Sequence, residues 1–132
     1  MKQYEVVGAV IVKDGLVLCA RRNTGGPLGG LWEFPGGKIE SGETPRQALE
    51  REIVEELECD VVVGAEIAST THTYAFGVVR LQTFYCELLA GTPTATEHAE
   101  LRWVDPTQLH TLEWAPADVP AVEKIEEDPP RR

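Results

Sequence analysis

Three glutamates, Glu52, Glu55 and Glu56, lie within about one turn of a helix predicted from Pro45 to Leu57. Like charges three or four residues apart destabilise a helix by roughly 0.2–0.5 kcal/mol per pair. A hard divalent cation such as Mg²⁺ reverses that effect, because it takes carboxylate and phosphate oxygens as ligands. The acidic arc borders the apolar stripe of the helix, whereas a merely solvated acidic face, the alternative, lies opposite the stripe. The spacing therefore predicts carboxylates on the floor of a groove, where they bind metal ions.

The start of this helix is marked by local signals. Thr44 suits the N-cap, Pro45 suits the first helical position, and Gln47 completes a capping box. The predicted helix therefore begins at Pro45.

A loop is predicted ahead of the helix, from Pro35 to Glu43, and its first glycines are Gly36 and Gly37. Glycine lets the backbone approach a ligand closely and tolerates positive φ. The carbonyl of Gly36 or Gly37 is therefore a further candidate metal ligand, and an ordinary turn is the alternative.

The relation among these residues resembles the Nudix box of hydrolases that act on nucleoside diphosphate linkages. That box reads Gly, five residues, Glu, seven residues, Arg-Glu, an apolar residue, any residue and Glu-Glu. The matching residues are Gly37, Glu43, Arg51, Glu52, Ile53, Glu55 and Glu56. The chain departs from the box at Glu58, where the family usually has a glycine that caps the helix. We expect this change to cost about 1 kcal/mol or to alter the helix ending.

Segments outside the box extend the resemblance to the MutT branch of the family. They read RRNTGGPLGGLWEFPGGKIE, EHAELRWV and WAPADVP. The resemblance implies an α/β fold, the Nudix α/β/α sandwich with a mixed central sheet, as a single domain over residues 1–127 with a disordered tail at 128–132. The pattern of elements alone predicts a mixed α and β domain.

The same resemblance implies roles for the carboxylates. Glu52, Glu55, Glu56 and Glu97 are the implied catalytic residues, and they bind metal together with Gly36 or Gly37. Glu97 lies six residues before Trp103, and the alternatives are that Glu100 takes this role or that Glu97 is a solvated loop charge. Arg51 is expected to be structural, pairing with Glu43 or Glu55, while direct contact with phosphate is the alternative.

The residues implied to contact the nucleotide are Arg22, Glu33, Phe34, Pro35, Gly36 and Asp118. Surface exposure is the alternative for Arg22, a core position for Phe34, and helix capping for Asp118. An ionised Asp118 only accepts hydrogen bonds, which leans towards the amine of cytosine. The family resemblance leans towards guanine, and both bases stay open.

These assignments predict a Mg²⁺-dependent diphosphatase, with Mn²⁺ as a substitute, that converts a nucleoside triphosphate to the monophosphate and pyrophosphate. The leading substrate is 8-oxo-dGTP, whose removal from the nucleotide pool prevents mutation; CTP, dCTP or 5-methyl-dCTP is the alternative. A nucleotide-binding sensor without activity is the hypothesis from a different class. Sensors of that kind usually lose box carboxylates, and all are present here.

Composition limits the kinds of molecule that the chain is expected to bind. The 132 residues carry a formal net charge of −10, which argues against a nucleic-acid backbone as partner. The chain lacks an apolar run long enough for a membrane span and the apolar stretch of a signal peptide. We expect a cytoplasmic monomer or homodimer acting on a small nucleotide. Cys19, Cys59 and Cys86 are expected to be buried free thiols, and His98, in a Glu-rich loop, is expected to stay outside the site.

The remaining elements follow from strand residues and turn signals. The pair Asp14-Gly15 predicts a hairpin turn. The segment from Asn23 to Gly30 is predicted to be a mobile loop that can close over a ligand. Trp32 and Tyr74 are assigned to the core. Strands are predicted at 4–12, 16–20, 31–34, 61–68, 69–76, 78–89 and 101–104, and a second helix at 120–126.

Overall fold

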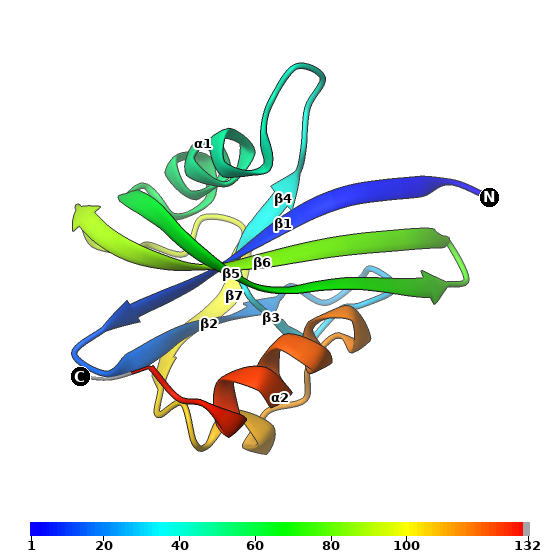
Figure 1. Ribbon diagram of the computed structural model, residues 1–132. Helices are drawn as coiled ribbons and strands as arrows, with labels where there is room; N and C mark the ends of the chain where they lie inside the picture. The colour runs from blue at the N-terminus through cyan, green and yellow to red at the C-terminus, as the bar shows by residue number, and fades with distance from the viewer. Residues whose placement is uncertain (131–132) are drawn as a thin grey trace.

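The computed structural model describes residues 1–130. Within them, the chain forms one mixed seven-stranded sheet with an α-helix on each face (Figure 1). The elements are β1 (Gln3–Lys13), β2 (Leu16–Arg22), β3 (Trp32–Glu33), β4 (Gly36–Lys38), α1 (Pro45–Leu57), β5 (Asp60–Tyr74), β6 (Gly77–Ala90), β7 (His98–Val104) and α2 (Val119–Glu127), with short 3₁₀ turns at Leu109–Thr111 and Pro116–Asp118. The predicted α/β/α sandwich is confirmed.

The sheet runs in the order β3-β2-β1-β6-β5, with β4 paired to β1 and β7 paired to β2. The β1–β6 pair is parallel and the other pairs are antiparallel. β1 therefore lies at the centre of the fold, and β4, which carries the glycine pair, is joined directly to it.

Two apolar cores follow from the alternation of side chains along β1. Val7 and Ile11 face one side, where they pack with the apolar stripe of α1. Val10 faces the other side, where it packs with Trp32 and with Ile125 of α2. Each helix is thus fixed to the sheet by its buried face.

Helix α1 has the predicted bounds and the predicted capping box. The Thr44 side chain accepts a hydrogen bond from Gln47 N–H, and the Gln47 side chain accepts one from Thr44 N–H. At the other end Glu58 takes the left-handed conformation, with φ of 56°. The helix thus ends where a glycine would end it, and a β-carbon in this conformation costs about 1 kcal/mol.

The predicted hairpin between β1 and β2 is confirmed. Asp14 and Gly15 have φ of 52° and 77°, as a two-residue turn with two positive φ values requires. The three cysteines are free and buried, also as predicted.

Two predicted elements are wrong. The segment predicted as a loop from Pro35 begins with β4, because Gly36 and Lys38 pair with Gly8 and Val6 of β1. The two strands predicted at 61–68 and 69–76 are one strand, β5, because register shifts between Val63 and Ala68 bend it without ending it.

Of the expected tail, residues 128–130 are described, and Asp128 N–H closes α2 by donating to Lys124 O. Residues 131 and 132 lie outside the described part of the chain. None of the described helices is long and apolar enough to cross a membrane.

Candidate active site

A pocket of about 520 Å³ gathers most of the predicted nucleotide contacts. It takes residues from both helical sides of the sheet, including Glu56 from α1 and Asp118 from the turn before α2. The predicted residues that line it are Arg22, Glu33, Phe34, Gly36, Gly37, Glu56 and Asp118. Pro35 lies outside this lining, and its carbonyl accepts a hydrogen bond from Ala9 N–H.

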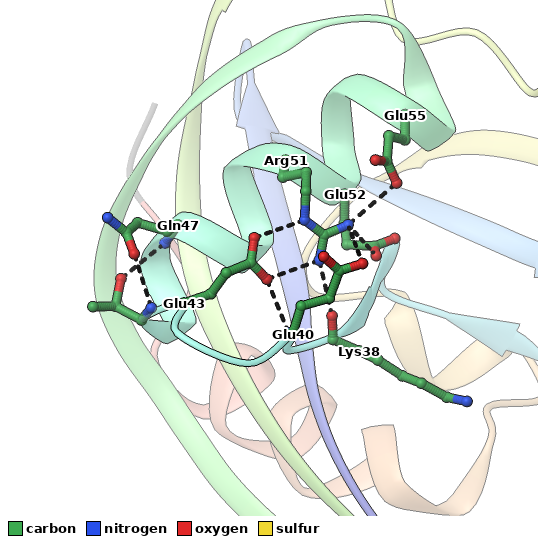
Figure 2. A network of polar contacts seen from close by, with 8 residues as sticks. Lys38, Glu40, Glu43, Gln47, Arg51, Glu52 and Glu55 are labelled. Carbon is green, nitrogen blue, oxygen red and sulfur yellow. Dashed lines mark hydrogen bonds and ion pairs between the residues drawn. The ribbon is translucent and has the colours of Figure 1, made fainter.

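Arg51 lies at the centre of a cluster of glutamates (Figure 2). Its guanidinium donates two hydrogen bonds to Glu43, at 2.7 and 2.9 Å, one to Glu52 at 2.8 Å and one to Glu55 at 3.2 Å. It also donates to the Lys38 carbonyl at 3.1 Å, which ties α1 to β4. The hydrogen bonds from Arg51 lower the pKa of Glu43 to about 2. Both predicted partners of Arg51 are therefore present at once.

The glycine pair provides space rather than unusual backbone angles. Neither Gly36 nor Gly37 has positive φ. A β-carbon on Gly36 would overlap the Val7 carbonyl oxygen of β1, and a β-carbon on Gly37 would overlap the carboxylate of Glu52. These two positions therefore need glycine so that β4 can pair with β1 while Glu52 lies against β4.

Glu56 is the box carboxylate that lines the pocket. Its Oε2 atom is buried and makes no hydrogen bond to the described residues. Burial, followed by the charges of Glu52, Glu33 and Glu97, raises its pKa to about 8. A carboxyl group in this setting lacks a counter-charge.

The donor set fits a hard divalent cation. Glu52, Glu55 and Glu56 offer carboxylate oxygens, as Mg²⁺ prefers, and the orphaned oxygen of Glu56 is a free ligand atom. Among residues 1–130 these side chains do not form a ready cluster of three ligands, because Glu52 and Glu55 are hydrogen-bonded to Arg51. Binding an ion would therefore exchange hydrogen bonds of Arg51 for bonds to metal.

The loop before β7 brings Glu97 close to Glu56. The Thr96 hydroxyl donates to the Glu56 carbonyl at 2.6 Å, and the charge of Glu97 contributes to the raised pKa of Glu56. Glu100 instead forms an ion pair with Arg102 at 2.7 Å. Of the two candidates, Glu97 is the one whose charge acts on Glu56.

Glu33 is held between two cationic or donor side chains. Its Oε1 atom accepts from Arg22 at 3.0 Å, and its Oε2 atom lies 2.9 Å from Nε2 of His98. His98 is not among the residues that line the pocket, but β7 begins at His98 and its ring contacts Glu33, which does line the pocket. Sequence alone gives no signal for this contact, which depends on the pairing of three strands.

Asp118 occupies the N-cap position of α2, but its side chain makes no capping hydrogen bond. Its Oδ1 atom accepts instead from Phe34 N–H at 3.0 Å. Burial, followed by the charge of Glu33, raises the pKa of Asp118 well above its ordinary value. The raised pKa favours the protonated form over the ionised form on which the lean towards cytosine depends, and a protonated carboxyl group donates as well as accepts. Phe34 both lines the pocket and packs in the core, 4.7 Å from the Trp114 ring.

Tyr74 is a pocket residue that sequence reasoning assigned to the core. Its hydroxyl accepts from Ala117 N–H at 2.8 Å, and its ring stacks on Phe76 with centroids 4.9 Å apart. Both rings line the pocket. Tyr74 ends β5 and Phe76 lies in the turn before β6, and two aromatic residues two positions apart are a weak signal that strand periodicity alone does not separate from a core pattern.

Comparison with known proteins decides the family. The NUDIX domain family matches residues 6–124. The chain belongs to the Nudix hydrolase family. This Nudix hydrolase is 41% identical over 123 residues to the CTP pyrophosphohydrolase of Escherichia coli, covering 93% of this chain and 91% of that protein.

Two further relatives agree with this membership. The 8-oxo-dGTP diphosphatase of Haemophilus influenzae is 30% identical over 127 residues, covering 94% of this chain and 93% of that protein. The solution structure of a Staphylococcus aureus MutT protein of the Nudix family superposes with a TM-score of 0.79 at 49% identity, covering 96% of this chain and 98% of that one. The predicted family and hydrolase class are confirmed.

Proposed function

We propose that this Nudix hydrolase converts nucleoside triphosphates to the monophosphate and pyrophosphate with a divalent cation held by Glu52, Glu55 and Glu56. The observation that carries the proposal is the buried, unpaired Oε2 atom of Glu56 in the wall of the pocket. With a pKa of about 8, Glu56 is largely protonated at pH 7 in the absence of metal. Ionised Glu56 would repel a triphosphate, so we expect a cation to displace the proton and to neutralise both the carboxylate and the phosphates.

Mg²⁺ is the expected ion and Mn²⁺ a substitute, with Glu97 and the carbonyl of Gly36 or Gly37 as further ligands. A bound divalent cation neutralises phosphoryl oxygens and lowers the pKa of water. Arg51 orients Glu52 and Glu55 through its hydrogen bonds. Arg22, at the mouth of the pocket, contacts the nucleotide or its phosphates, because a guanidinium suits planar oxyanions.

The base is expected to lie against Phe34 and Asp118. Protonated Asp118 can donate to guanine O6, a contact that the ionised form cannot make. This supports 8-oxo-dGTP as the substrate and removal of that mutagenic nucleotide from the pool as the role. The similarity to a CTP pyrophosphohydrolase supports CTP, dCTP or 5-methyl-dCTP as the second candidate.

The setting we propose is the cytoplasm, with the protein a monomer or a homodimer. A formal net charge of −10 supports a small-molecule partner rather than a nucleic acid.

Release of pyrophosphate by the purified protein from 8-oxo-dGTP, dGTP, CTP, dCTP and 5-methyl-dCTP, with and without Mg²⁺, tests the proposal. We expect Mg²⁺-dependent turnover with the highest kcat/KM for 8-oxo-dGTP. A preference for a cytosine nucleotide of about tenfold or more would transfer the assignment to the second candidate. No turnover on any nucleotide, with binding retained, would overturn the proposed reaction.

A further inference from the structure

Both carboxylate oxygens of Glu33 are engaged, and the two partners come from different strands. Arg22 is the last residue of β2, and His98 is the first residue of β7. The strand registers set Glu33 opposite Ala20 and His98 opposite Arg22, so β3 and β7 flank β2 on its two sides. Three neighbouring strands therefore converge on one carboxylate in the pocket.

The two partners of Glu33 differ in how firmly they are held. The Arg22 side chain is 43% exposed, whereas the His98 side chain is 5% exposed. A half-exposed arginine can follow Glu33 through several rotamers, but a buried ring cannot. The His98 ring is therefore the contact that fixes the orientation of the Glu33 carboxylate.

The second ring nitrogen of His98 shows that the ring is not placed for packing alone. Its Nδ1 atom is buried and makes no hydrogen bond to residues 1–130. An unsatisfied buried nitrogen destabilises the folded protein, and an apolar side chain of similar size would avoid that cost. The contact with a carboxylate assigns the proton to Nε2, so the ring acts as a directed N–H donor to Glu33.

Glu33 lies within electrostatic reach of both parts of the site. Its charge contributes to the raised pKa of Glu56 on the metal side and of Asp118 on the base side. A rotation of Glu33 would therefore change the field at both carboxyl groups. His98 also directly follows Glu97, so the same buried ring anchors the segment that carries Glu97.

We propose that His98 is a positioning residue that holds Glu33 in the orientation in which it meets the nucleotide. The inference rests on the proposed function, because it assigns Glu33 to nucleotide contact. His98 itself touches neither the metal ligands nor the reacting phosphates in this role.

Three variants test the proposal: His98→Gln, whose amide N–H can reach Glu33, His98→Asn, whose amide is too short, and His98→Leu, which has no donor. The matched control is His110→Leu, because His110 also pairs with a glutamate, Glu126, at 2.7 Å, outside the residues that line the pocket. We expect His98→Leu and His98→Asn to raise KM for the best nucleotide by about tenfold with a smaller change in kcat. The KM of His98→Gln should stay within about threefold of the wild-type value, and the KM of the control His110→Leu should equal the wild-type value.

Coupling to Glu33 separates positioning from a general structural role. In a double-mutant cycle, Glu33→Gln should make His98→Leu nearly silent, because the residue through which His98 acts is already altered. Thermal melts confirm that each variant folds. Multiplicative losses, or a wild-type KM in both His98→Leu and His98→Asn, would overturn the proposal. So would a folded His98→Gln as impaired as His98→Leu.

The proposed function can fail separately. If the wild type hydrolyses no nucleotide, the assignment of the reaction is wrong, and the role of His98 is then judged by calorimetric binding of the nucleoside monophosphates. Affinity that is about tenfold weaker in His98→Asn, with recovery in His98→Gln, would support the positioning role. Equal affinity in all variants would overturn it.

Discussion

Glu56 and Asp118 are two carboxyl groups that line the same pocket, and burial raises the pKa of both, but their neighbours differ. Glu56 has three acidic neighbours and an oxygen without a partner, so it needs a cation. Asp118 is buried and accepts a hydrogen bond from Phe34 N–H, and burial raises its pKa. In the function that we propose, Glu56 lies on the side of the pocket that binds the metal and phosphates, and Asp118 lies on the side that binds the base.

Substitution of Asp118 tests its protonated state. Because a protonated aspartate and an asparagine both donate and accept, we expect Asp118→Asn to keep KM within about threefold at pH 6–7, while Asp118→Ala raises it about tenfold or more. With a raised pKa, the wild type should lose affinity as the pH rises towards that pKa, and Asp118→Asn should not. A wild-type KM that does not change with pH from 6 to 9, together with a severe defect in Asp118→Asn, would contradict this assignment.

At the level of single residues, the sequence indicated which side chains could bind ligands, but it did not indicate how burial shifts their pKa values. The box spacing located Glu52, Glu55 and Glu56, because neighbours on a helix are set by local geometry. The raised pKa of Asp118 depends on burial, which the local sequence does not indicate. The contacts of His98 depend on long-range strand pairing, which no local pattern reports.

At the level of elements, the site depends on how β4 lies against α1. Gly37 leaves room for the Glu52 carboxylate, and Arg51 ties the Lys38 carbonyl of β4 to the helix. The helix could be predicted to the residue because its capping box and proline are local signals. Strand β4 could not, because two glycines in sequence indicate a turn, and pairing with β1 overrides that preference.

A β-carbon at Gly37 should disrupt the packing of the Glu52 carboxylate against β4. We expect Gly37→Ala to lower kcat/KM by about a hundredfold, because it displaces the Glu52 carboxylate, a predicted metal ligand. Gly26→Ala is the matched control, because Gly26 does not have positive φ and nothing lies within 4 Å of its added β-carbon. Steady-state kinetics beside thermal melts decide the point. Equal activity in the two variants would show that Glu52 does not need its position against β4.

At the level of the whole molecule, the formal net charge of −10 is partly concentrated in the site. Arg51 forms ion pairs with Glu43, Glu52 and Glu55, one positive charge shared among three carboxylates. Glu56 has no such partner among the described residues, and burial raises its pKa. When Glu56 is ionised and no metal is bound, its unpaired charge destabilises the folded protein and should lower the free energy of unfolding.

The stability of the metal-free protein should therefore depend on pH through Glu56. Its pKa of about 8 lies above the ordinary 4.5, so its favourable contribution is complete below about pH 4.5 and is lost as the pH rises to about 8. We expect Glu56→Gln to raise the free energy of unfolding by on the order of 1–2 kcal/mol at pH 8 in chelator, after allowance for solvent screening, and to change little at pH 4. Urea unfolding at the two pH values measures this. If Glu56→Gln stabilises the protein equally at pH 4 and pH 8, the charge of Glu56 is not the cause of the stabilisation.

Calorimetric titration of Mg²⁺ into the wild type and Glu56→Gln, in two buffers that differ in ionisation enthalpy, tests most directly whether these carboxylates bind a cation. At pH 7 we predict that the wild type releases about one proton for each ion bound at Glu56, since a carboxyl group must ionise to become a ligand. Glu56→Gln should bind Mg²⁺ at least about tenfold more weakly and should release no proton. Equal affinity and equal proton release in the two proteins would contradict the account.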